Sequence, residues 1–194
     1  MNASSPVDAE SELEVLMVRY QEGDLAAATA LIHRLSPQLN RFFAVQLASR
    51  GDADDLLQET WLRIHAVRHT YRAGQPVLPW FYAIARHIRV DHYRKMRRTT
   101  AREERLERMP EKAAVAPAGS AKTLDLETLL APLPESQREV VEMLKIAGMS
   151  IEEVARATSS SAGSVKQKAH RAYERLREQL SGMGWSKRHA GGLS

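Results

Sequence analysis

The chain contains no cysteine among its 194 residues, which excludes disulfide bonds and thiolate metal sites and is consistent with a reducing cytoplasm. No apolar run approaches the roughly 20 residues that span a bilayer, so we expect no membrane insertion. The N-terminus is acidic and lacks the basic start and apolar core of a signal peptide. With 43% hydrophobic residues, the chain can still build a packed core in one large or two small domains.

Strand patterns are also nearly absent, so the predicted fold class is all-α. Apolar periodicity predicts helices over residues 7–21, 24–49, 53–69 and 79–108. Residues 109–122 hold two prolines, a glycine and many small side chains, which is typical of a flexible linker. We therefore predict a four-helix domain at residues 1–108, a linker at 109–122, a second helical domain at 123–180 and a disordered tail at 181–194.

The charge is distributed unevenly along the chain, although the net charge is only +4. Residues 86–102 hold seven basic side chains against one acid, and residues 166–177 hold five against one. Residues 52–59 hold four acids and no base. Two basic patches and one acidic patch predict two contacts with nucleic acid and a separate protein partner.

The predicted helix at residues 79–108 has two contrasting sides, and Pro79 suits its first turn. The side expected to be buried carries Trp80, Phe81, Ile84 and Ile88. The opposite side carries Tyr82, Arg86, Arg89, Tyr93 and Arg97. Arginines neutralise phosphates and aromatic rings stack on unpaired bases, so this stripe predicts contact with single-stranded nucleic acid. A solvated basic face with two incidental tyrosines is the alternative.

The second domain has the pattern of a helix-turn-helix. One helix is expected from Pro134 to Gly148, and Ser150 with Glu153 forms a capping box that opens a short helix. A longer helix is expected to begin near Ala162, with Val165, Ala169, Ala172 and Leu176 facing inward. Its outward residues are Lys166, Gln167, His170 and Arg171, side chains suited to reading base edges in duplex DNA. A helical hairpin with a charged surface is the alternative.

The acidic patch lies on the predicted third helix. We expect its inward side to carry Ala53, Leu57, Trp61 and Ile64. The outward side is expected to carry Asp55, Glu59, Leu62 and Ala66, with Asp52 and Gln58 at its border. An exposed leucine surrounded by polar groups is typical of a docking surface. A solvated acidic face with one exposed leucine is the alternative.

Four segments together resemble a known family: GDADDLLQETWLRIH, LPWFYAIARHIRVDHYRK, LPESQREVVEMLKIAGMSIEEVA and SVKQKAHRAYERL. In this order and spacing they are similar to regions two and four of bacterial RNA polymerase sigma factors. The resemblance covers about residues 10–180. With no other domain and a short linker between the two regions, the chain resembles the small extracytoplasmic-function (ECF) group. The resemblance implies a cytoplasmic transcription initiation factor that binds core RNA polymerase, directs it to promoters and helps to melt the minus-ten element.

The resemblance also implies roles for the patches. The surface that binds the clamp helices of the largest polymerase subunit would comprise Asp52, Asp55, Gln58, Glu59 and Leu62. The minus-ten element would be opened and read by Tyr82, Arg86, Arg89, Tyr93 and Arg97. The loop at residues 70–77 would hold a base flipped out of the non-template strand. The minus-thirty-five element would be read as duplex by Lys166, Gln167, Lys168, His170 and Arg171.

The resemblance predicts an anti-sigma protein as a further partner, and it predicts no catalysis, cofactor or small-molecule substrate. One departure lies in the turn before the recognition helix, where Ser159 and Ser160 replace the usual glycine and aliphatic residue. An ordinary helix-turn-helix regulator that binds duplex DNA remains the alternative. An enzyme is a second one, since His65 and His69 are spaced as a metal pair, although the H-E-x-x-H pattern is absent.

Overall fold

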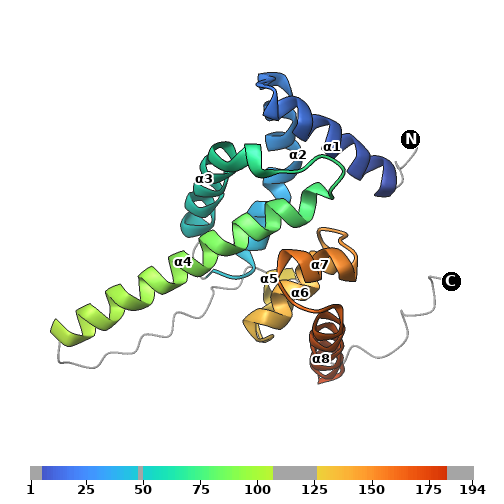
Figure 1. Cartoon of the computed structure of the whole chain (residues 1–194). Helices are drawn as coiled ribbons and strands as arrows, with labels where there is room; N and C mark the ends of the chain where they lie inside the picture. The colour runs from blue at the N-terminus through green and yellow to red at the C-terminus, as the bar shows by residue number, and fades with distance from the viewer. Residues whose placement is uncertain (1–5, 48–49, 107–125, 183–194) are drawn as a thin grey trace. The chain divides into compact units, whose positions relative to one another are not determined.

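The computed structural model describes residues 6–47, 50–106 and 126–182. Over these ranges the secondary structure consists of helices, without a strand, which confirms the predicted all-α class. The chain divides into two compact units, residues 1–123 and 124–194 (Figure 1). The predicted linker at residues 109–122 and most of the predicted tail lie outside the described residues. The last helix continues to Gly182, slightly beyond the predicted end of the second domain.

The first unit contains α1 (Pro6–Gln21), α2 (Leu25–Ala44), α3 (Arg50–Val67), the 3-10 helix η1 (Arg68–Thr70) and α4 (Val77–Leu106). A glycine and an aspartate form the connection between α1 and α2. Gly23 has a positive φ of 94° after α1, and the Asp24 carboxylate caps α2 by accepting hydrogen bonds from the Ala26 and Ala27 N–H groups. These backbone bonds, together with Arg19, lower the pKa of Asp24.

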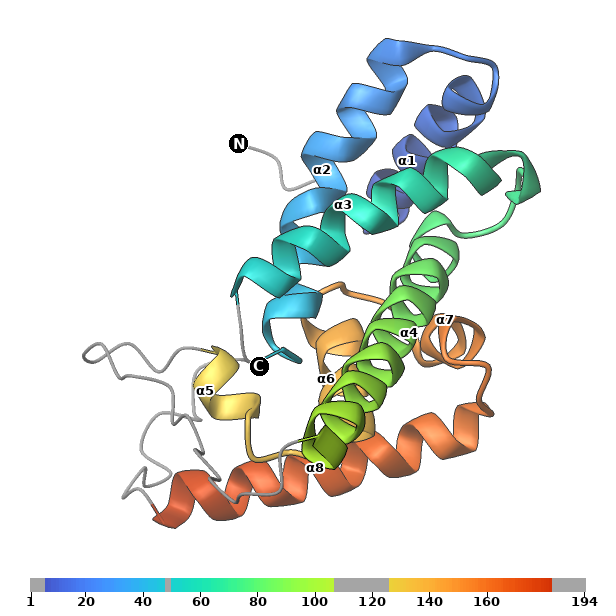
Figure 2. The ribbon, with the colours of Figure 1, turned by 90° about the vertical axis from the view of Figure 1, so that its left-hand side faces the viewer.

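In the first unit, two helix boundaries differ from the prediction by three residues or more. Helix α2 ends at Ala44, before the predicted end at residue 49. Helix α3 begins at Arg50, so Gly51 and Asp52 lie in its first turn and do not precede it. The cost of glycine in a helix is the loss of backbone freedom, about 0.5–1 kcal/mol relative to alanine, which the packing of α3 can offset. Figure 2 shows α3 and α4 diverging from the loop that joins them.

The core of the first unit is centred on α2, which buries Leu31, Leu35, Leu39, Phe42 and Phe43. On α3 the inward residues are Ala53, Leu56, Thr60 and Ile64, each at most 1% exposed. The prediction placed Leu57 and Trp61 there, but both are only half-buried. Thr60 fits the core because its hydroxyl donates to the Leu56 carbonyl at 2.7 Å. Trp61 lies at the edge of the core, where its indole N–H donates to Ser36 Oγ at 3.0 Å.

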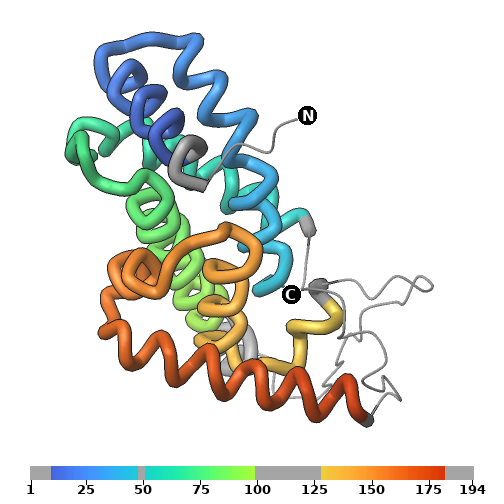
Figure 3. Tube along the Cα trace, turned by 90° about the vertical axis from the view of Figure 1, so that its right-hand side faces the viewer, coloured from blue at the N-terminus to red at the C-terminus, as the bar shows by residue number. Residues whose placement is uncertain are grey.

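The second unit contains α5 (Leu126–Leu130), α6 (Glu135–Lys145), α7 (Ile151–Ala157) and α8 (Ala162–Gly182). The predicted capping box is present, with Ser150 and Glu153 bonding to each other's backbone N–H groups. Val154 and Val165 are fully buried where α7 and α8 pack together. The trace in Figure 3 shows the short turn between these two helices. This geometry is that of a helix-turn-helix.

The turn between α7 and α8 has a strained residue. Ser159 has a φ of 51°, the left-handed region that favours glycine. Its N–H donates to the Arg156 carbonyl, and the N–H of Ser160 donates to the Ala155 carbonyl at 2.9 Å. This pair of bonds is the Schellman motif, which prefers glycine at the first position and an apolar residue at the next. The turn therefore has the usual geometry but has serine at both positions.

We expect Ser159→Gly to stabilise the second unit by about 1 kcal/mol, because glycine adopts a positive φ without the steric cost of a Cβ. Ser160→Gly is the matched control and should destabilise slightly, since its φ is not positive and glycine there only adds freedom to the unfolded chain. Hydrogen exchange of the α7 and α8 amides in the full chain measures both effects. Equal effects of the two substitutions would contradict the strain at Ser159.

Candidate functional site

The acidic patch on α3 forms an open surface. Asp55, Gln58, Glu59 and Leu62 are exposed and Asp52 is half-buried. The Leu62 side chain is 73% exposed, which leaves an apolar group in water beside the carboxylates of Asp55 and Glu59. The five predicted residues therefore lie along one accessible face, which we call the α3 acidic face. It offers an apolar contact within a negative field, a combination suited to a helix that carries basic and apolar side chains.

The stripe on α4 passes from a covered part to an open part. Tyr82 is 1% exposed and Arg89 is 5% exposed. The Tyr82 ring packs edge-to-face on Phe42 of α2, with centroids 5.3 Å apart. The Arg89 guanidinium lies over the same Phe42 ring, 5.7 Å from its centroid. The structure therefore differs from the expected outward placement of Tyr82 and Arg89, since both side chains contact the Phe42 ring of α2. Their contact with the minus-ten element stays a prediction.

The predicted buried side of α4 shifts for the same reason. Phe81 and Ile88 are buried as expected, whereas Trp80 and Ile84 are half-buried. Both α2 and α3 pack against α4, so the buried arc is wide and extends toward Tyr82. The apolar pattern of α4 alone cannot locate the edge of its buried arc. The pattern does not show which neighbouring helices place aromatic side chains against α4.

The open part of the stripe begins near Tyr93. This tyrosine is 52% exposed, and the Arg97 guanidinium lies over its ring, 5.8 Å from the centroid. Arg94 and Arg98 are exposed on the same turns. Arg86, nearer the core, is half-buried. Tyr93 and Arg97 together offer a flat ring and a stacked cation, the pair of groups that binds single-stranded nucleic acid.

The loop between η1 and α4 has a buried anchor and an exposed tip. Tyr71 is 4% exposed and lies edge-to-face with Trp80, centroids 5.8 Å apart. Its hydroxyl donates to the carbonyl of Gln75. Burial, with smaller contributions from Glu14 and Glu10, raises the pKa of Tyr71 to about 12, so the hydroxyl remains protonated and can donate. Residues 72–75 are exposed at the tip.

Helix α1 contacts this loop, a feature that the sequence analysis did not predict. The Glu14 carboxylate accepts a hydrogen bond from the Gly74 N–H, and the Glu10 carboxylate accepts one from the Val77 N–H. Both pairs are more than 50 residues apart along the chain. The only available signal was the spacing of polar residues along α1, which indicates a shared face but not its partner.

The predicted recognition helix α8 exposes its polar residues. Lys166, Gln167, His170 and Arg171 are exposed, and Lys168 is half-buried. The inward residues Val165, Ala169 and Ala172 are buried as predicted, and Leu176 is half-buried. His170 Nε2 lies 3.3 Å from Glu174 Oε1 on the next turn, so Glu174 orients the imidazole. The accessible edge of α8 thus carries donors and acceptors for duplex DNA.

The histidines of the first unit do not form a metal site in this structure. Among the described residues, no group of three or more His, Asp or Glu side chains is placed to hold a metal ion. His65 Nδ1 instead shares a hydrogen bond of 2.8 Å with the Tyr20 hydroxyl. Burial raises the pKa of Tyr20, which keeps this hydroxyl protonated. His69 is exposed in η1.

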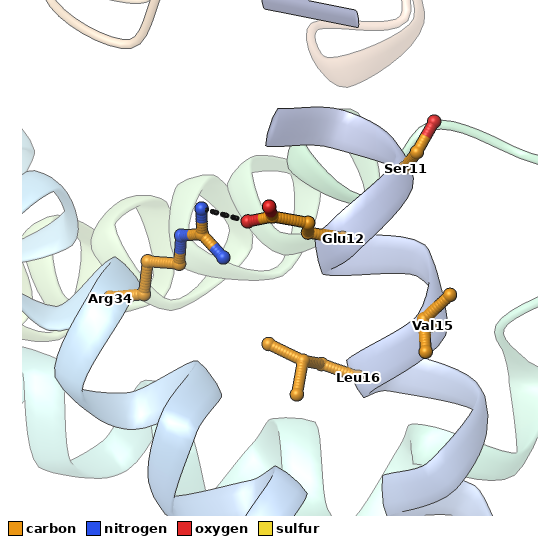
Figure 4. A pocket seen from close by; sticks show the side chains of 5 residues that line it. All are labelled: Ser11, Glu12, Val15, Leu16 and Arg34. Carbon is orange, nitrogen blue, oxygen red and sulfur yellow. Dashed lines mark hydrogen bonds and ion pairs between the residues drawn. The ribbon is translucent and has the colours of Figure 1, made fainter. Parts of the chain in front are cut away.

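A shallow pocket of about 430 Å³ lies between α1 and α2. Figure 4 shows its lining and the ion pair between Glu12 and Arg34. Val15 and Leu16 supply its apolar wall, and the Ser11 side chain at its rim points away from the Glu12 carboxylate. Among the described helices, none is long and apolar enough to cross a membrane.

Two family models match the chain. The model described as "Sigma-70 region 2" matches residues 31–99, and "Sigma-70, region 4" matches residues 123–176. Among curated proteins, the chain is 33% identical to "ECF RNA polymerase sigma factor SigF" of Caulobacter vibrioides, over 89% of this chain and 96% of that one. It is 34% identical to "RNA polymerase sigma factor CarQ" of Myxococcus xanthus, over 84% and 95%.

Two solved structures are similar in fold. The sigma factor RpoE of Bartonella quintana, in a co-crystal with the anti-sigma factor NepR, superposes with a TM-score of 0.61 at 27% identity. The match covers 79% of this chain and 96% of that one. CnrH, in complex with the cytosolic domain of CnrY, superposes with a TM-score of 0.67 at 21% identity, over 88% and 98%. The second similarity concerns the fold alone.

Proposed function

Because the chain belongs to the ECF group of RNA polymerase sigma factors, which are transcription initiation factors, we propose that its exposed groups divide the work of initiation between them. The α3 acidic face binds the clamp helices of the largest subunit of core RNA polymerase. The observation that carries this assignment is the exposed Leu62 beside Asp55 and Glu59 on one helix face. The protein acts in the cytoplasm and catalyses no reaction of its own.

Promoter opening is assigned to α4 and the preceding loop. Tyr93 and Arg97 contact the separating strand directly, with Arg86 at the inner margin of the stripe. Tyr82 and Arg89 support them through their packing on Phe42. The loop at residues 70–77 receives a base flipped out of the non-template strand. Flipping a base costs a few kcal/mol, which stacking and hydrogen bonds in the loop must offset.

Recognition of the minus-thirty-five duplex is assigned to α8. Lys166, Gln167, His170 and Arg171 are exposed on its outer edge, with Lys168 partly covered. Because RpoE is bound by NepR in its crystal, we also propose that an anti-sigma protein regulates this chain.

The test of the proposal is titration of the purified full chain with core RNA polymerase that lacks any sigma factor, followed by transcription from a library of randomised promoters. Specific binding and transcripts that start behind one shared pair of promoter elements are expected. No binding to polymerase, combined with specific binding to duplex DNA, would contradict the proposal and favour an ordinary helix-turn-helix regulator.

We expect Tyr93→Ala combined with Arg97→Ala to slow promoter opening at least about tenfold, because stacking on one base contributes roughly 1–3 kcal/mol. Binding to core polymerase should be unchanged, since neither side chain belongs to the α3 acidic face. Stopped-flow fluorescence of a dye in the minus-ten region measures opening. Tyr93→Phe with Arg97→Lys is the conservative control and should retain most of the rate. Equal losses on duplex and pre-melted promoters would exclude a role in strand separation.

A further inference from the structure

One face of α1 lies against the loop that joins η1 to α4 (Figures 1 and 3). Two carboxylates of this face bond to the loop backbone. The Glu14 carboxylate accepts a hydrogen bond from the Gly74 N–H, and the Glu10 carboxylate accepts one from the N–H of Val77. Val77 is the first residue of α4. A carboxylate bonded to a backbone N–H makes a charge-assisted hydrogen bond, stronger than one between neutral groups. The loop is therefore held from its tip to the start of α4.

A third residue of the same face holds the other end of the loop. The Gln21 amide donates to the carbonyl of Arg68 at 2.7 Å and to the carbonyl of Tyr71 at 2.9 Å. Glu10, Glu14, Met17 and Gln21 are spaced by four, three and four residues, so they share one side of α1. Met17 is fully buried between them. We call Glu10, Glu14 and Gln21 the α1 clamp.

The clamp acts on a segment that would otherwise be loosely held. Residues 72–75 are exposed, and Gly74 has a positive φ of 81°. Apart from the clamp, the Tyr71 hydroxyl donates to the Gln75 carbonyl and two tight backbone turns add hydrogen bonds within the loop. A base-binding loop must be fixed before it meets the base, because ordering it during binding would reduce the affinity. Four bonds from a separate helix supply that fixation.

We propose that Glu10, Glu14 and Gln21 are positioning residues for promoter recognition, which hold the backbone of residues 71–77 in the shape that captures a flipped-out base. This inference rests on the proposed function of the loop. It assigns to α1, which carries none of the predicted DNA-contacting residues, an indirect part in base selection. The carboxylates of Glu10 and Glu14 lie next to the proposed base-binding loop, where negative charge is unfavourable for binding nucleic acid. Their hydrogen bonds to backbone N–H groups of the loop give a structural reason for acids at these positions.

The experiment compares Glu10→Ala/Glu14→Ala with the unmodified full chain in complex with core RNA polymerase. The promoter library has a randomised minus-ten region, and sequenced transcripts give the base preference at each position. A fluorescent adenine analogue, placed in one selected promoter, identifies the flipped position because its emission rises when it leaves the stack. Amide hydrogen exchange at Gly74 and Val77 in the full chain reports directly on the clamp.

The expected result is a loss of preference of about tenfold at the flipped position only, near the lower end of what one well-placed base contact supplies. The Gly74 and Val77 amides should exchange faster, while polymerase binding and preference in the minus-thirty-five element stay the same. Glu12→Ala is the matched control, because Glu12 lies on another side of α1 and pairs with Arg34 of α2 (Figure 4). It should leave both readouts unchanged.

Several outcomes would overturn the inference while leaving the proposed function intact. These are faster exchange without a change in base preference, or an equal loss at every promoter position, which would indicate a role in stability alone. If the double variant unfolds, Glu14→Gln decides the question. Glutamine keeps a hydrogen-bond acceptor, so Glu14→Gln should lose less base preference than Glu14→Ala. Equal base preference in the unmodified chain, Glu14→Gln and Glu14→Ala would show that Glu14 does not position the loop. A wild-type protein without preference at any flipped position would instead refute the proposed role of the loop.

Discussion

Replacing Asp55 and Glu59 with arginine is expected to weaken binding to core RNA polymerase by at least about 100-fold, because like charges placed across an interface cost several kcal/mol. Both side chains are exposed, so the substitutions should not disturb the packing of α3. Fluorescence anisotropy of the labelled full chain, titrated with core enzyme at two salt concentrations, measures the effect. The loss should be larger at low salt, where charges are less screened.

The control for this variant is Glu12→Arg with Glu22→Arg, two exposed acids outside α3. The surface ion pair of Glu12 with Arg34 that the control breaks contributes at most about 1 kcal/mol. Each substitution adds two charges, so both double variants change the net charge from +4 to +8. Leu62→Ala is a third variant for the same titration. It should weaken binding by removing an apolar contact, and the salt dependence of binding should stay as in the unmodified chain. If the control pair weakens binding as much as Asp55→Arg/Glu59→Arg, the effect is one of net charge and the α3 acidic face is not the docking surface.

The features predicted well are those encoded by neighbouring residues. The capping box of Ser150 and Glu153 and the inward spacing of Val165, Ala169 and Ala172 are local signals, and the structure confirms both. The exposure of the α3 acidic face follows in the same way, since acids are seldom buried without partners. Local signals therefore fixed the class of fold and the most exposed of the proposed contact residues.

The features predicted poorly depend on contacts between distant segments. Tyr82 and Arg89 have the spacing of an outward stripe, but both contact the ring of Phe42, which lies about 40 residues earlier in the chain. Amphipathic side chains of this kind pack against a ring as readily as they face water. The contacts of Glu10 and Glu14 with the loop were missed for the same reason, because periodicity identifies a face without identifying what lies against it.

The turn before α8 was predicted in part, since neighbouring residues indicated its position but not its backbone geometry. The sequence showed that Ser159 and Ser160 replace a glycine and an aliphatic residue, but it could not show whether the backbone would change. The structure keeps the positive φ at Ser159 and both hydrogen bonds of the motif. The turn geometry is thus set by the packing of α7 on α8, and the serine carries the strain. The proposed contacts of α8 with DNA therefore do not require a glycine at residue 159.

We expect Phe42→Ala to destabilise the first unit by about 3–5 kcal/mol, the usual cost of removing a buried aromatic side chain. The Phe42 ring is fully buried and contacts Phe43 at 5.4 Å and Tyr82 at 5.3 Å between centroids. It also lies beneath the Arg89 guanidinium. Because small domains are stable by only about 5–15 kcal/mol, a loss of this size would populate the unfolded unit measurably.

Urea unfolding monitored by tryptophan emission measures this loss. Trp61 and Trp80 lie in the first unit and both contact Phe81, and a Trp185→Phe background removes the third tryptophan. Phe42→Leu is the companion variant, which roughly preserves volume and should cost less than about 1.5 kcal/mol. It keeps the helices packed but removes the ring under Tyr82 and Arg89. If those residues support the stripe, Phe42→Leu should slow promoter opening at normal polymerase affinity. If it opens promoters at the wild-type rate, Tyr93 and Arg97 act without that support.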